Sequence, residues 1–181
     1  MMIWLLGLAL LPLTAYAAAS VAEMAVGDAL PGLRGEFLTG RTAVLPQAAS
    51  GRVALLLLGF SYDSRFAVEA WAGKFREQFA TDQRVTFYEI PMIGGLARMG
   101  KWFIDSGMRQ GTPKTDYEHV ITVYGGTDAW KQRVGFHDLK TAYLILLDAS
   151  GRVAWRHAGG LDERAYHALS SEVSRLLLGP T

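Results

Sequence analysis

The apolar run at residues 53–60, VALLLLGF, constrains the fold of this chain more than any other part of its sequence. A run of this length without alternating polar residues is typical of a strand that is buried on both faces of a sheet. Such a sheet needs further elements packed on both of its sides. The run therefore predicts a layered α/β protein, with residues 55–58 as its most buried segment.

Apolar residues spaced three and four apart predict helices after this run. The first follows a polar turn at residues 61–64, where Asp63 or Ser64 can cap it, and the last follows Asp162, another cap residue. A further helix is expected around residues 96–104, and residues 130–136 fit one helical turn. The predicted buried faces are Val68, Trp71, Phe75 and Phe79 in the first helix, and Tyr166, Leu169, Val173, Leu176 and Leu177 in the last.

The remaining segments predict strands. A hairpin that turns at Gly40 precedes the apolar run, strands follow at residues 85–93 and 119–125, and a second hairpin turns at Gly151. A strand–helix–strand crossover requires parallel pairing, whereas a hairpin is antiparallel. We therefore predict an α/β three-layer sandwich with a mixed central sheet, helices on both faces and an N-terminal hairpin. The extension and hairpin occupy residues 20–50, and the main domain occupies residues 51–181.

Composition excludes several classes of function. The 181 residues contain no cysteine, so disulfides, thiolate catalysis, zinc ribbons and iron–sulfur clusters are excluded. Eighteen Lys and Arg against 17 Asp and Glu give a net charge of +1, far less basic than is usual for a nucleic-acid-binding domain. We expect no nucleic acid partner. The four histidines, His119, His137, His157 and His167, lack metal-ligand spacing, so we expect no metal site.

The N-terminus resembles a secretory signal peptide. No charged side chain precedes Glu23, and the apolar stretch MMIWLLGLALLPL leads into the small residues around Ala15 and Ala17. We predict a signal peptide at residues 1–19 and an extracytoplasmic protein. The uncharged stretch is also long enough to span a bilayer, so an uncleaved anchor is the alternative and would be the protein's only contact with a membrane.

Two motifs match catalytic or nucleotide-binding patterns only in part. Ser61 follows a buried strand, as in a nucleophile elbow, but Asp63 stands where that motif needs glycine. A serine hydrolase using Ser61 is the alternative to a plain polar turn, with Asp138 or Asp148 and His157 or His167 in the required order. Residues 95–101 match G-x-x-x-x-G-K, but Trp102 replaces the Ser or Thr of a nucleotide-binding loop. We expect no cofactor.

The order of elements, with a polar turn between a buried strand and a helix, resembles the thioredoxin superfamily. Its members carry a CxxC motif at that turn, because the helix N-terminus stabilises a thiolate. The matching stretch here is residues 61–66, SYDSRF, and both cysteine positions are occupied by residues that cannot carry out thiol exchange. The superfamily's cis-proline before the late hairpin is also missing, since residues 139–142 read LKTA. The resemblance therefore implies a redox-inactive scaffold.

A narrower resemblance covers residues 53–178. The segments FYEIPM, TAYLILLD and GRVAWR, with the closing helix, are similar to the mitochondrial assembly-factor family for the membrane sector of F-type ATP synthase, ATPase complex subunit ten. That family is thioredoxin-like and acts as a chaperone. The resemblance implies a non-enzymatic assembly factor that binds a protein partner, with a membrane complex under assembly as the expected client.

Binding residues are expected at the strand-to-helix turn, which a thioredoxin-like fold exposes. Tyr62, Asp63 and Arg65 combine an aromatic ring with a charged pair, a combination that suits an interface hot spot. The alternative is structural: Asp63 caps the helix and Tyr62 packs on that helix.

Overall fold

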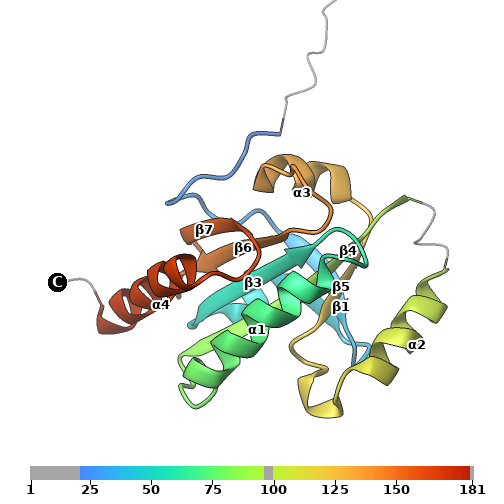
Figure 1. The fold of residues 1–181 in the computed structure, drawn as a ribbon, viewed down its shortest axis with the longest axis horizontal. Coiled ribbons are helices and arrows are strands. Elements are labelled where there is room, and N and C mark those ends of the chain that lie inside the picture. Colours follow the sequence, from blue (N-terminus) through green and yellow to red (C-terminus); the bar gives the residue numbers. More distant parts are fainter. Residues whose placement is uncertain (1–20, 96–99, 180–181) are drawn as a thin grey trace, which may run out of the picture.

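The computed structural model describes residues 21–95 and 100–179 (Figure 1). The signal peptide predicted at residues 1–19 lies outside this range, as do Leu96 and Met99 of the second predicted helix. The elements are β1 (Leu33–Phe37), β2 (Thr42–Leu45), the 3-10 turn η1 (Gln47–Ala49), β3 (Val53–Gly59), α1 (Arg65–Phe79), β4 (Val85–Ile93), α2 (Lys101–Gly111), the 3-10 turn η3 (Lys114–Asp116), β5 (Ile121–Tyr124), α3 (Thr127–Val134), β6 (Ala142–Leu147), β7 (Val153–Gly159) and α4 (Glu163–Leu178).

The strands form one mixed sheet in the order β2-β1-β5-β4-β3-β6-β7. β3, β4 and β5 are parallel, whereas β6 and β7 continue the sheet antiparallel on one side and β1 and β2 on the other. The N-terminal hairpin turns at Gly40 as predicted and joins the same sheet, because β1 pairs with β5.

β3 is the centre of the molecule. Leu55 pairs with Phe87 of β4 on one side and with Leu146 of β6 on the other. The four leucines at residues 55–58 are all 0% exposed, which confirms the burial predicted from the unbroken apolar run.

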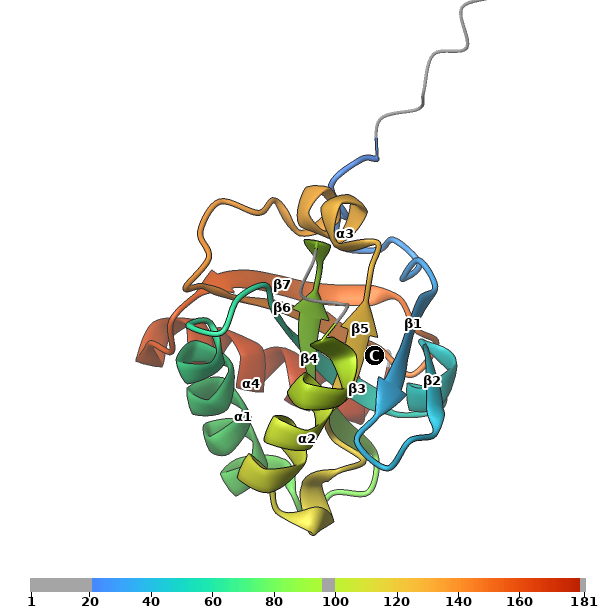
Figure 2. The same ribbon diagram turned by 90° about the vertical axis from the view of Figure 1, so that its right-hand side faces the viewer.

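Helices cover both faces of the sheet, which confirms the predicted three-layer arrangement (Figures 1 and 2). On one face, α1 and α4 pack on Leu55 and Leu57 through side chains that include Trp71 and Leu169. On the other face, α3 contributes Trp130 to a core with Leu56 and Leu58. α2 lies over β5 and β1, where Tyr124 donates a hydrogen bond to Asp105 and Lys101 pairs with Glu36.

The helix ends confirm one capping prediction and correct the other. Asp162 accepts a hydrogen bond from the Ala165 amide and so caps α4 as predicted. Ser64 occupies the cap position of α1, but its side chain makes no cap bond, because its hydroxyl donates to the Ser61 carbonyl instead. Within residues 21–95 and 100–179, no helix combines the length and the apolar composition needed to cross a membrane.

Candidate functional site

The turn between β3 and α1 is closed by two serines. The Ser64 hydroxyl donates to the Ser61 carbonyl at 2.8 Å, and the Ser64 amide donates to the Ser61 hydroxyl at 3.1 Å. The Ser61 amide in turn donates to the Ser64 hydroxyl at 3.3 Å. We call residues 61–64 the serine turn. Its two hydroxyls satisfy the backbone groups that a sharp turn leaves without partners.

The serine turn is also tied to the loop that precedes β6. The Ser61 hydroxyl donates to the Leu139 carbonyl at 2.6 Å. Gly59 allows Ser64 to pack closely against the end of β3, because a Cβ atom at residue 59 would lie 2.6 Å from the Ser64 hydroxyl oxygen. The turn therefore lies beside the loop at residues 139–141, as the sequence resemblance implies, and it leaves no space for a side chain at residue 59.

The surroundings of Ser61 do not form a catalytic triad. Among the described residues, no histidine or carboxylate is hydrogen-bonded to Ser61, whose partners are Leu139 and Ser64. Asp148 accepts hydrogen bonds from its own turn, and His157 lies 3.9 Å from Asp162 and stacks on Trp155. Within residues 21–95 and 100–179, no hydrogen-bonded base is therefore positioned to activate the Ser61 hydroxyl.

The three residues predicted for partner binding are all exposed. Tyr62 is 73% exposed, and Asp63 and Arg65 are exposed as well. The Arg65 guanidinium lies 4.2 Å from the ring centre of Tyr62 and 4.5 Å from that of Phe66. Asp63 does not cap α1, whose N-cap residue is Ser64. The structural alternative for Asp63 is therefore wrong, whereas Tyr62 does lie against α1, through Arg65.

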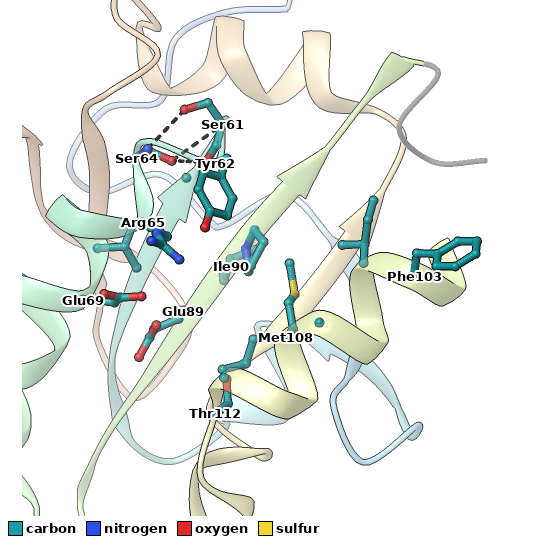
Figure 3. A pocket seen from close by; sticks show the side chains of 17 residues that line it. Ser61, Tyr62, Ser64, Arg65, Glu69, Glu89, Ile90, Phe103, Met108 and Thr112 are labelled. Carbon is teal, nitrogen blue, oxygen red and sulfur yellow. Dashed lines mark hydrogen bonds between the residues drawn. The ribbon is translucent and has the colours of Figure 1, made fainter. Parts of the chain in front are cut away.

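A cavity of about 510 Å³ opens beside the serine turn, between α1 and α2 (Figure 3). We call it the α1–α2 groove. Its walls are mainly apolar and include Val68 of α1, Ile104 and Met108 of α2, and Val120. Tyr62, Arg65, Glu69, Glu89 and Phe103 also line it, so two of the three predicted binding residues belong to the groove.

Glu89 is the unusual group of this groove. It is the charged residue of β4, its side chain is 19% exposed, and its Oε1 atom lies 4.0 Å from Nη2 of Arg76. Among the described residues, no N–H or O–H group donates a hydrogen bond to its carboxylate. Burial raises the pKa of Glu89 to about 7; Arg76 opposes this rise, while the carboxylates of Glu69 and Asp116 add to it.

Sequence reasoning missed the groove. Glu89, Glu69 and Phe66 were not predicted as site residues, and the groove joins segments far apart in the chain. One signal was present in the sequence, because Glu89 interrupts the otherwise uncharged strand VTFYEIPMI. A charged residue in a strand of that kind needs a partner or an opening to solvent.

The described residues offer no ready metal centre. Within residues 21–95 and 100–179, no three His, Asp or Glu side chains lie together in a way that could hold a metal ion.

Comparison with known proteins identifies the architecture. No protein-family model and no curated protein matches the chain. Several solved structures do match. A peroxiredoxin-like protein from Aquifex aeolicus has a TM-score of 0.56 and 21% identity over 87% of this chain and 90% of its own. The thioredoxin domain of a thiol-disulfide oxidoreductase from Bacteroides vulgatus has a TM-score of 0.55 and 18% identity over 83% of this chain and 99% of its own. The fold is thioredoxin-like.

A third match is a member of the Sco family of cytochrome c oxidase assembly proteins, with a TM-score of 0.57 and 11% identity over 86% of this chain and 98% of its own. At these identities the likeness is one of fold. In this fold a turn joins the buried strand β3 to α1, and Ser61 and Ser64 stand three residues apart in that turn, after the end of β3 at Gly59.

Proposed function

We propose that this protein is a redox-inactive, thioredoxin-like factor that acts outside the cytoplasm and binds a partner protein through the serine turn. The role is non-enzymatic, and the partner is a protein under assembly. The apolar segment at residues 1–13, with Ala15 and Ala17 after it, supports the location.

The composition of the serine turn supports this role most directly. Ser61 and Ser64 stand at positions that resemble those of a CxxC motif, and a hydroxyl cannot exchange with a disulfide. Their hydrogen bonds nevertheless keep the turn closed and hold Tyr62 and Arg65 at the surface. A turn that lacks the chemistry but retains its exposed geometry is suited to binding.

The side chains beside the turn have the properties of an interface hot spot. Arg65 lies against the rings of Tyr62 and Phe66, and this stacking restricts the guanidinium before any partner arrives. The N–H groups of a stacked guanidinium point outward from its edge, where carbonyl or carboxylate acceptors can reach them. Tyrosine and arginine are both enriched at hot spots.

The nature of the client rests on resemblance. Residues 53–178 resemble the assembly-factor family for the membrane sector of F-type ATP synthase, which supports a membrane complex as the client. The Sco-family match is an assembly protein too, although for a different complex. Both support assembly as the process in which the protein takes part.

The test is a photoreactive amino acid at Asp63, in the full chain expressed in its native host. We expect one discrete protein to crosslink and the Tyr62→Ala, Arg65→Ala double variant to reduce its recovery by about tenfold or more. The matched control, Arg34→Ala with Val44→Ala on the β1–β2 hairpin, should keep full recovery. Both double variants change exposed side chains, so their Tm should stay within about 2 °C of the wild type.

Three results would contradict the proposal. Unchanged recovery in the Tyr62/Arg65 variant would place the binding surface elsewhere. A Tm several degrees lower would make these residues structural. Stoichiometric labelling by a fluorophosphonate that is lost in Ser61→Ala would replace the proposal with a serine hydrolase.

A further inference from the structure

The α1–α2 groove combines apolar walls with two carboxylates. Val68, Ile104 and Met108 line its sides, and the largely buried Glu89 and the exposed Glu69 line it as well (Figure 3). A ligand that fills such a groove needs an apolar stem and a positively charged end. Lysine and arginine side chains have this construction, because they bury their methylene groups along apolar surface while the charged head reaches a polar site.

We propose that the α1–α2 groove binds a lysine or arginine side chain from an extended segment of the partner protein, with Glu89 as its counter-ion. This inference rests on the proposed function and names the partner's chemistry at the same surface. Tyr62 and Arg65 belong to both the turn and the groove, so a segment that crosses the turn can place one side chain in the groove.

The charges around Glu89 favour a cation. From α1, Glu69 and Arg76 face it, and from η3, Asp116 does so. Arg76 already pairs with Asp116 at 2.9 Å, whereas its contact with Glu89 is 4.0 Å long. Arg65 at the mouth is stacked between aromatic rings. Three carboxylates thus face two guanidiniums, and the Glu89 carboxylate keeps room for a further hydrogen-bond donor.

Protonation of Glu89 should control the affinity for a cation. Burial raises the pKa of Glu89 to about 7, so the empty groove holds a partly neutral carboxyl group near neutral pH. A bound ammonium or guanidinium favours the ionised form and lowers that pKa. Binding therefore releases a proton, and affinity should increase by about tenfold between pH 6 and pH 8.

Three matched peptides test the inference with the full chain. They are acetyl-Gly-Leu-Lys-Leu-Gly-amide and its norleucine and glutamate counterparts, titrated at pH 6 and pH 8 while NMR follows the Met108 methyl group. We expect the lysine peptide to bind most tightly, with the tenfold pH dependence given above. Glu89→Gln should weaken lysine binding by about tenfold and abolish its pH dependence. The control Glu77→Gln, an exposed carboxylate of α1, should change neither.

Each contrary result has a distinct meaning. Equal binding of the norleucine and lysine peptides would show that the groove selects apolar chains, and tighter binding of the glutamate peptide would make Arg65 the dominant charge. Either result overturns the inference. Full partner recovery by Glu89→Gln, together with its loss in the Tyr62/Arg65 variant, would refute this inference and leave the proposed function intact. If both variants kept full recovery of the partner, this inference and the proposed function would both be refuted.

Discussion

The buried carboxyl group of Glu89 lowers the stability of the folded protein once it is ionised. This group ionises with a pKa of about 7 because burial penalises the charge, whereas the unfolded chain ionises at the usual value of 4.5. Between these values the folded state binds more protons than the unfolded state. The free energy of unfolding therefore falls as pH rises from 4.5 to 7, and this contribution is constant above that range.

Glu89→Gln should remove this pH dependence. The shift corresponds to up to about 3 kcal/mol, so we expect the variant to be more stable than the wild type at pH 8 by roughly 1–3 kcal/mol, with the gain vanishing near pH 4.5. Urea denaturation of both proteins at several pH values measures the difference between their free energies of unfolding. The other carboxylates contribute equally to both proteins, so their contributions cancel in this difference. A difference that does not vary with pH would show that Glu89 ionises normally in the folded state.

Gly59 and Ser64 should be energetically coupled. A Cβ atom at residue 59 would lie 2.6 Å from the Ser64 hydroxyl oxygen, so Gly59→Ala should destabilise the protein by about 1–3 kcal/mol. Ser64→Ala removes that oxygen and should recover part of the loss when the two changes are combined. A double-mutant cycle by urea denaturation measures this coupling. Strictly additive effects would mean that the turn relaxes around the new methyl group.

Among the elements, β3 should be the least tolerant of truncation. Its leucines at residues 55–58 are completely buried between two neighbouring strands and two layers of helix or loop. Leu56→Ala should cost about 2–5 kcal/mol, the sum of lost transfer energy and the cavity left behind. Val44→Ala on the edge strand β2 is the control and should cost less than about 1 kcal/mol. Chemical denaturation measures the free energy of unfolding of both variants. A similarly small loss of stability in Leu56→Ala and Val44→Ala would mean that the core collapses around the cavity in β3.

Elements with a strong local pattern could be predicted from sequence, and elements set by tertiary contacts could not. The strand at residues 85–93 was predicted with its observed ends, because its apolar residues are bounded by polar residues and a Gly pair. The segment at residues 130–136 was ambiguous, and α3 proves to start earlier, at Thr127, between Gly126 and Gly135 in the left-handed region. The α1 cap was predicted in part: Ser64 does occupy the N-cap position, but its hydroxyl donates to the Ser61 carbonyl and makes no cap bond.

The same division applies to the candidate site. The exposed turn was predictable, because a thioredoxin-like resemblance fixes its place after the buried strand. The groove was not, since it depends on how α2 packs over β5 and β1, and on which face of β4 Glu89 occupies. Contacts between segments so far apart leave no periodic signal in the sequence.

For the molecule as a whole, the parallel pairing of β3 and β4 brings the turn and the groove together. Gly59 at the end of β3 pairs with Pro91 of β4, only two residues beyond Glu89. The serine turn follows β3, and the groove is lined both by residues of that turn and by residues of β4, so the two share one surface. A partner segment can therefore contact both without any rearrangement of the sheet.

The hydroxyl bonds of the serine turn make the shape of the turn independent of thiol–disulfide exchange. A turn that carried two thiols would exist in a reduced and an oxidised form, and its partner would meet two different shapes. Ser61 and Ser64 have one form only, because their hydrogen bonds neither gain nor lose electrons. A change in the thiol–disulfide balance of the environment should therefore leave the shape of the turn unchanged, and binding of the proposed partner should respond to partner concentration, salt and pH instead.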